Sequence, residues 1–242
     1  MDNSTLSSLR AWAFKYRGGI WTALFVVILA LARPVPSRLP AGIALVVVGQ
    51  LLRGWGVGCI KRYRGEEVKA DELATWGPYA LVRNPLYVGN GLVGLGWGWI
   101  SGNAATVVFL VAFWVLYGLL IVPHEEAFLR GKYGDEFEEW ASRVPAFLPK
   151  WSLYEGGMLQ FSWKTFIRRE YATIMSAIFT YTVLDYILYY LIDVRNAGKG
   201  ACDSLNWLRH SLYLLIAYTI IALLIKLIKH KTKWLDATPD RD

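Results

Sequence analysis

The stretch of sequence that decides the fold is residues 86–123, which reads LYVGNGLVGLGWGWISGNAATVVFLVAFWVLYGLLIVP. Two apolar runs, 86–100 and 104–123, are joined here by Ser101-Gly102-Asn103, residues that favour a turn. A helix that crosses a bilayer needs about 20 mostly apolar residues, and the second run has that length. The stretch therefore predicts a tight hairpin of two membrane helices.

Four further apolar runs lie on either side of this hairpin, at residues 18–32, 41–59, 171–194 and 211–225. The chain of 242 residues is 55% hydrophobic and only 19% charged, with a mean hydropathy of +0.32. Soluble domains average about 25% charged residues. We therefore predict an all-α fold, a polytopic membrane helix bundle of about six transmembrane helices, and exclude a soluble, disordered or disulfide-rich secreted protein.

The positive charges indicate the orientation in the membrane. If the N-terminus is cytoplasmic and the six runs alternate in direction, 20 of the 26 Lys and Arg residues fall on the cytoplasmic side. Both termini are then cytoplasmic, and a bacterial inner membrane is the favoured location. The net charge of +7 reflects this topology and does not require a nucleic-acid partner. No His and Cys residues have metal-ligand spacing, so no metal is expected. The oligomeric state stays open.

We divide the chain into three parts. Residues 1–40 form an N-terminal transmembrane helix, residues 41–150 form a core that contains the hairpin, and residues 151–242 form a C-terminal extension. The extension begins with an interfacial stretch, 151–170, and continues with two transmembrane helices. Asp185 lies inside one of them, and an acid within the membrane is a candidate functional residue. The alternative is a carboxylate that only holds helices together.

Polar side chains flank both cytoplasmic ends of the hairpin. Arg83 and Tyr87 stand at its start, and Glu125 and Glu126 follow its end, so we expect them to converge. An arginine can hold a carboxylate, a glutamate can hold an ammonium or a ribose diol, and an aromatic ring stabilises a cation such as a sulfonium. S-adenosylmethionine carries all of these groups. The alternative is purely structural: an interfacial arginine, a solvated helix end and glycines that serve packing.

Two ordered motifs sharpen this hypothesis. The first contains Gly77-Pro78-Tyr79 and continues through residues 83–89, RNPLYVG; the second contains Glu125-Glu126-x-x-Leu129, Tyr133-Gly134 and Arg143-Val144-Pro145. Together they resemble the signature of a superfamily of integral membrane methyltransferases. This superfamily contains the isoprenylcysteine carboxyl methyltransferases and the phospholipid (phosphatidylethanolamine) N-methyltransferases. The resemblance covers roughly residues 41–150 and includes Arg53.

The resemblance implies a membrane enzyme that uses S-adenosylmethionine at the cytoplasmic face without a Rossmann domain. Carried over by position, the cofactor-binding residues are Glu72, Leu73, Tyr79, Arg83, Asn84, Pro85, Leu86, Tyr87, Gly89 and Glu125. The catalytic candidates are Glu125, Glu126 and Arg83. Arg53 is a candidate for contact with the acceptor, which would be a membrane lipid or lipidated small molecule. Asp185, which lies outside the resemblance, is a second candidate because it is an acid within a membrane helix.

Two departures leave the acceptor open between a phospholipid amine and a prenylcysteine-type carboxylate. Carboxyl methyltransferases usually have His where this chain has Asn84, and a substrate-linked Arg where it has Ile121. Two other classes of function also stay open. One is a membrane reductase related to the sterol reductases and using NADPH; the other is a non-catalytic membrane scaffold.

Overall fold

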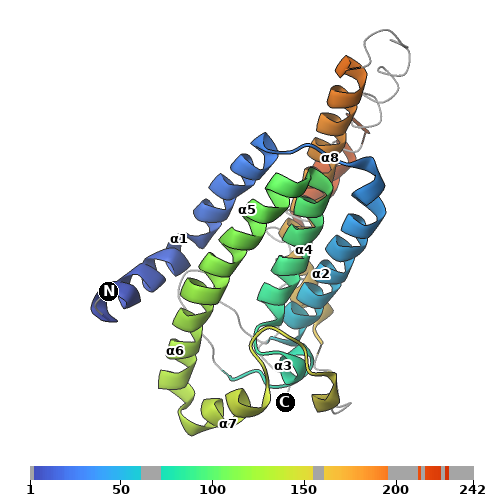
Figure 1. Ribbon diagram of the computed structural model, residues 1–242. Helices are drawn as coiled ribbons and strands as arrows, with labels where there is room; N and C mark the ends of the chain where they lie inside the picture. The colour runs from blue at the N-terminus through green and yellow to red at the C-terminus, as the bar shows by residue number, and fades with distance from the viewer. Residues whose placement is uncertain are drawn as a thin grey trace.

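The computed structural model describes residues 3–60, 72–154 and 161–195, together with the short stretches 212–213, 216–224 and 227–228. These residues contain helices and no strand. The elements are α1 Asn3–Ala30, a 3₁₀ turn Pro36–Arg38, α2 Leu39–Cys59, α3 Pro78–Leu81, α4 Pro85–Ser101, α5 Asn103–Phe113, a π-helical segment Trp114–Ile121, α6 Val122–Tyr133, α7 Asp135–Arg143, a 3₁₀ turn Trp151–Leu153 and α8 Trp163–Arg195. The predicted all-α membrane bundle is confirmed (Figure 1).

Within the described residues, three helical segments are long and apolar enough to cross a bilayer: Ser4–Ala30, Pro36–Cys59 and Asn103–Tyr133. The 17-residue helix α4 is shorter, about 25 Å at 1.5 Å per residue. Helix α1 begins well before the apolar run at residue 18, because residues 3–17 contain no Gly or Pro to interrupt it. The predicted sixth span, 211–225, and the cytoplasmic C-terminus include residues outside the described ones, as does part of the interfacial stretch 151–170.

The predicted hairpin is present, formed by α4 and α5. Its turn centres on Gly102, whose φ of +106° is a conformation that L residues with a side chain rarely adopt. The connection between α1 and α2 covers this turn: the backbone N–H of Arg33 donates to the carbonyl of Ser101 at 2.7 Å. Arg38 reaches the same turn and donates to Asn103 Oδ1 at 2.8 Å.

Helices α2 and α4 approach each other closely because glycines with heptad spacing face each other. A Cβ placed on Gly49 would lie 2.7 Å from the carbonyl oxygen of Gly89, and one placed on Gly96 would lie 2.5 Å from that of Gly42. These separations leave no room for a side chain, so the two backbones touch. The close contact fixes the position of α4, whose N-terminal end carries the predicted motif.

A π-helical segment joins α5 to α6 within one long helix, Asn103–Tyr133. Pro123 has no backbone N–H, so it cannot bond to the carbonyl of Leu119 as an α-helix requires. Instead, Nε of Arg10 in α1 donates to that carbonyl at 3.2 Å. The π-helical segment carries Tyr117, which is buried in the bundle.

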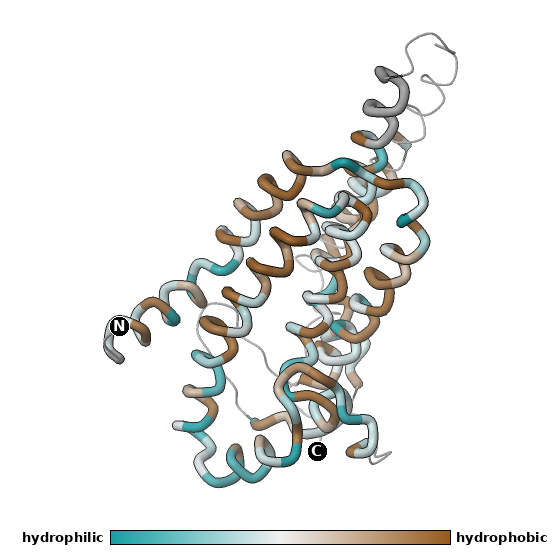
Figure 2. The backbone as a smooth tube through the Cα atoms, in the orientation of Figure 1, coloured by the Kyte–Doolittle hydropathy of each residue, from teal (hydrophilic) through white to brown (hydrophobic). Residues whose placement is uncertain are grey.

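The polar motifs gather at one end of the bundle. Figure 1 shows α3, α7 and the end of α6 together at the end opposite the turn between α4 and α5. Figure 2 shows mainly hydrophobic residues along the middle of the bundle and hydrophilic residues around α7. This arrangement is that of a membrane bundle with its polar segments at one surface.

Candidate functional site

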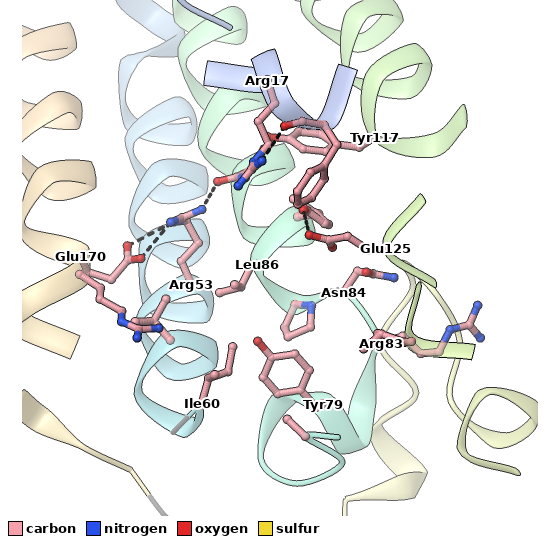
Figure 3. Close-up of a pocket in the computed structure, with 18 of the residues that line it drawn as sticks. Arg17, Arg53, Ile60, Tyr79, Arg83, Asn84, Leu86, Tyr117, Glu125 and Glu170 are labelled. Carbon is pink, nitrogen blue, oxygen red and sulfur yellow. Dashed lines mark hydrogen bonds and ion pairs between the residues drawn. The ribbon is translucent and has the colours of Figure 1, made fainter. Parts of the chain in front are cut away.

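A cavity of about 660 Å³ opens near the polar end of the bundle. Its volume lies within the range of sites for small molecules and cofactors. Residues from α1, α2, α3, α4, α6, α7 and α8 line it, together with Tyr117 of the π-helical segment and residues of the connections before and after α3. The cavity therefore extends across all three predicted parts of the chain, because the N-terminal helix and the extension both contribute to its walls (Figure 3).

The structure brings most of the predicted site residues into this one cavity. The predicted residues that line it are Glu72, Leu73, Tyr79, Arg83, Asn84, Pro85, Leu86, Tyr87, Glu125 and Arg53. Three predicted residues are not among the lining ones. Gly89 packs against Gly49 and Arg53 of α2, Glu126 contacts Arg83, and Asp185 lies further along α8.

Glu125 and Tyr87 connect the two ends of the hairpin, as their convergence in the sequence analysis predicts. The Tyr87 hydroxyl donates to Glu125 Oε1 at 2.8 Å. The Tyr87 ring lies against the Tyr117 ring, with 4.5 Å between the ring centroids, and Tyr117 stacks in turn on Trp21 of α1 at 5.4 Å. A carboxylate is thus held beside aromatic rings, an arrangement suited to a positively charged ligand group.

Arg83 is engaged in a clamp that holds the motif in place. Its Nε and Nη2 donate to the carboxylate of Glu126 at 2.9 and 3.2 Å, and its Nη1 donates to the carbonyls of Ala141 and Val144 at 2.9 and 2.8 Å. The Asn84 side chain also donates to Glu126, at 3.3 Å. Figure 3 shows Arg83 directed away from the other lining residues. The clamp therefore fixes residues 141–144 against the start of α4.

Helix α7 anchors the loop that forms the outer wall of the cavity. Phe137 and Trp140 of α7 are buried against Leu73 and Tyr79. Trp140 Nε1 donates to the backbone carbonyl of Tyr79 at 3.2 Å. Through this packing, α7 holds the loop that carries Leu73 and Tyr79 at the cavity.

Arg53 lies on the opposite wall, in α2. It forms a two-pronged ion pair with Glu170 of α8, with Nη2 to Oε1 at 2.9 Å and Nε to Oε2 at 3.2 Å. Its Nη1 donates to Asn90 of α4, and Asn90 Nδ2 donates to the Tyr117 hydroxyl at 3.1 Å. A polar network therefore runs from α8 through α2 and α4 to the aromatic rings.

Several lining residues were missed in the sequence analysis. They include Phe14, Arg17 and Trp21 of α1, Asn90, Tyr117, Trp140, and residues 168–172 of α8. Asn90 could have been found as a lone amide within an apolar run, and Glu170 as an acid at the start of another. The α1 residues carry no comparable signal, because their place in the cavity depends on long-range packing.

Comparison with known proteins gives consistent matches to the core. A family model described as phospholipid methyltransferase matches residues 37–136. The cobalt-zinc-cadmium resistance protein CzcN of Cupriavidus metallidurans is 40% identical over 117 residues, which are 48% of this chain and 49% of that protein. The nickel-cobalt-cadmium resistance protein NccN of Alcaligenes xylosoxydans xylosoxydans is 33% identical over 160 residues, 61% of this chain and 71% of that protein.

A eukaryotic enzyme matches part of the same core. The protein-S-isoprenylcysteine O-methyltransferase of Schizosaccharomyces pombe is 37% identical over 78 residues, which are 32% of this chain and 33% of that protein. The chain thus spans about half of CzcN and a third of the yeast enzyme. No solved structure gives a significant match.

Proposed function

Because the chain belongs to the superfamily of isoprenylcysteine carboxyl and phospholipid methyltransferases, we propose that it transfers a methyl group from S-adenosylmethionine to a lipid-like acceptor at the cytoplasmic membrane face. The observation that carries this proposal is the convergence of both motifs on one cavity, where Tyr87 holds Glu125. The carboxyl methyltransferase and the phospholipid methyltransferase chemistries require the same donor. They differ in the nucleophile that receives the methyl group.

The residues around the cavity fit S-adenosylmethionine by their chemistry. Glu72 and Glu125 offer carboxylates that can accept hydrogen bonds from an ammonium group or a ribose diol. Pro85 begins α4, and the first-turn N–H groups of a helix favour a carboxylate. Leu73, Leu86 and Leu129 give apolar surface for a flat ring. When bound, the cofactor supplies an activated methyl group on its sulfonium, and the electron pair of the broken carbon–sulfur bond stays on sulfur.

Within this proposal, each motif residue has a stated task. Glu125, oriented by Tyr87, accepts the proton that an amine acceptor must lose before it can act as a nucleophile; a carboxylate acceptor needs no such step. The predicted catalytic residues Arg83 and Glu126 act together, by holding residues 141–144 and the start of α4 in position. The surrounding apolar residues exclude water from the reacting atoms.

The experiment uses purified protein in detergent, methyl-labelled S-adenosylmethionine and a total bacterial lipid extract. Mass spectrometry identifies which lipid class gains the label. Calorimetry measures the binding of S-adenosylhomocysteine and of NADPH to the same preparation. We expect a labelled lipid and binding of S-adenosylhomocysteine alone. Binding of NADPH instead favours the reductase, and binding of neither molecule favours the scaffold; each contradicts the proposal.

A further inference from the structure

The ion pair between Arg53 and Glu170 is the most deeply buried charged contact that the structure describes. The side chain of Glu170 is 2% exposed and that of Arg53 is 15% exposed, and both residues line the cavity. Glu170 comes from α8, beyond the residues 37–136 that match the family model. A helix of the extension thus contributes a charged residue to the cavity wall, and this residue lies outside the part of the chain that matches the family model.

Four of the five N–H donors of the Arg53 side chain form hydrogen bonds with described residues, and the fifth does not. A guanidinium has five N–H donors. Glu170 receives two, the Thr173 hydroxyl receives one at 3.5 Å, and Asn90 receives one from Nη1. Among the residues that the structure describes, the second N–H of Nη1 has no partner. Since Arg53 lines the cavity, this donor is available to a bound molecule.

The network places Arg53 close to the proposed reacting centre. Asn90 links the Arg53 guanidinium to the Tyr117 hydroxyl, and the Tyr117 ring touches that of Tyr87, which holds Glu125. Figure 3 shows Arg53 and Glu125 on different sides of the cavity, with Tyr117 near both. A molecule that touches Arg53 therefore has room to present another of its groups beside Glu125.

The charges of the cavity wall favour an anion at this end. Three arginines of this wall, Arg53, Arg168 and Arg169, line the cavity beside a single glutamate, Glu170, which Arg168 and Arg169 directly precede in α8. An arginine held rigidly by a carboxylate loses little conformational freedom when it binds a carboxylate or a phosphate. The wall formed by α2 and α8 therefore has the chemistry of an anion-binding site.

We propose that Arg53 binds an anionic group of the methyl acceptor, a carboxylate or a phosphate, and that Glu170 is the positioning residue that holds Arg53 in the required orientation. This inference rests on the proposed function and assigns the acceptor end of the same cavity. It gives α8 a part in acceptor recognition that acts through Arg53. If the pair only holds α2 and α8 together, a double variant that keeps this packing should have the KM of the wild type.

The test compares Arg53→Met, Glu170→Leu and the double variant Arg53→Met/Glu170→Leu. Removal of one partner leaves a buried charge uncompensated, whereas replacement of both by apolar residues of similar size is close to neutral for stability. We measure melting temperature, the affinity for S-adenosylhomocysteine, and the KM for two probes. The probes are phosphatidylethanolamine in micelles, which carries a phosphate, and N-acetyl-S-farnesylcysteine, which carries a carboxylate. Glu139→Gln, which alters an exposed pair with Arg143 on α7, is the matched control.

We expect the double variant to regain the melting temperature that each single variant loses, yet to keep a KM at least tenfold above that of the wild type. Its affinity for S-adenosylhomocysteine should stay within twofold of the wild type. The probe whose KM rises identifies the anion as phosphate or carboxylate. A double variant with wild-type KM overturns the inference and leaves the proposed function intact. Wild-type protein that methylates neither probe and binds no S-adenosylhomocysteine overturns both.

Discussion

The Tyr87 hydroxyl donates a 2.8 Å hydrogen bond to Oε1 of Glu125, joining the first turn of α4 to the first turn of α6 across the cavity. The two residues are separated by the whole transmembrane hairpin. Their contact brings the end of the first sequence motif to the beginning of the second. Both residues line the cavity, so the contact that closes the hairpin also shapes the proposed site.

The variant Tyr87→Phe tests this bond while keeping the ring against Tyr117. A hydrogen bond to a charged group contributes about 1.5–3 kcal/mol, which corresponds to about 10- to 100-fold in affinity if it orients Glu125 toward the ligand. We expect calorimetry to show S-adenosylhomocysteine binding weakened by at least about tenfold. Tyr16→Phe, at a tyrosine of α1 that is 48% exposed, should bind as the wild type does. Unchanged affinity in both Tyr87→Phe and Glu125→Ala would remove these residues from the cofactor site.

The Arg83–Glu126 clamp should contribute to stability far more than a surface ion pair does. Arg83→Met leaves the Glu126 carboxylate half-buried without its main partner and frees the carbonyls of Ala141 and Val144. Loss of one partner of a buried pair costs on the order of 3 kcal/mol. Denaturant unfolding in detergent should detect this loss, and limited proteolysis should cut within residues 141–150.

Arg143→Met is the matched control for the clamp. It also removes the arginine of an Arg–Glu pair, but the side chains of Arg143 and Glu139 are 65% and 74% exposed. Exposed pairs contribute about 0–1 kcal/mol, so stability and proteolysis should change little. Equal effects of the two variants would show that the Arg83 contacts do not hold residues 141–150 in place.

The sequence predicts the helical hairpin and the convergence of Tyr87 with Glu125 because both follow from local patterns. Apolar runs show where helices lie, and a short turn requires the two ends of a hairpin to meet. The contribution of α1 and α8 to the cavity follows no such pattern. Glu170 meets Arg53 across 117 positions of sequence, and only the packing of α8 on α2 brings them together. Likewise, the position of Gly89 in the motif does not show whether this glycine faces a ligand or another helix. In the structure it faces α2.

Asp185 should be dispensable for catalysis. The cavity-lining residues of α8 end at Ala172, and 13 further residues of helix place Asp185 about 20 Å along the axis. We expect Asp185→Asn to keep the wild-type cofactor affinity and the wild-type rate of lipid methylation. A loss of turnover with unchanged cofactor affinity would instead place Asp185 at the acceptor. Stability can fall in either case, so the rate is measured at a temperature where the variant stays folded.

The glycine contact between α2 and α4 should be intolerant of even one methyl group. In Gly49→Ala, the new Cβ would lie 2.7 Å from the Gly89 carbonyl oxygen and 2.8 Å from the Val93 backbone nitrogen, and backbone atoms cannot move aside as a side chain can. The helices must separate, which displaces the start of α4 and with it Tyr87. We expect a lower melting temperature and weaker S-adenosylhomocysteine binding in the same variant.

Gly131→Ala in α6 is the control, since nothing lies within 4 Å of a Cβ there. It should raise stability slightly, by about 0.5–1 kcal/mol, because alanine favours a helix. If Gly49→Ala behaves like Gly131→Ala, the close approach of α2 and α4 does not position the site.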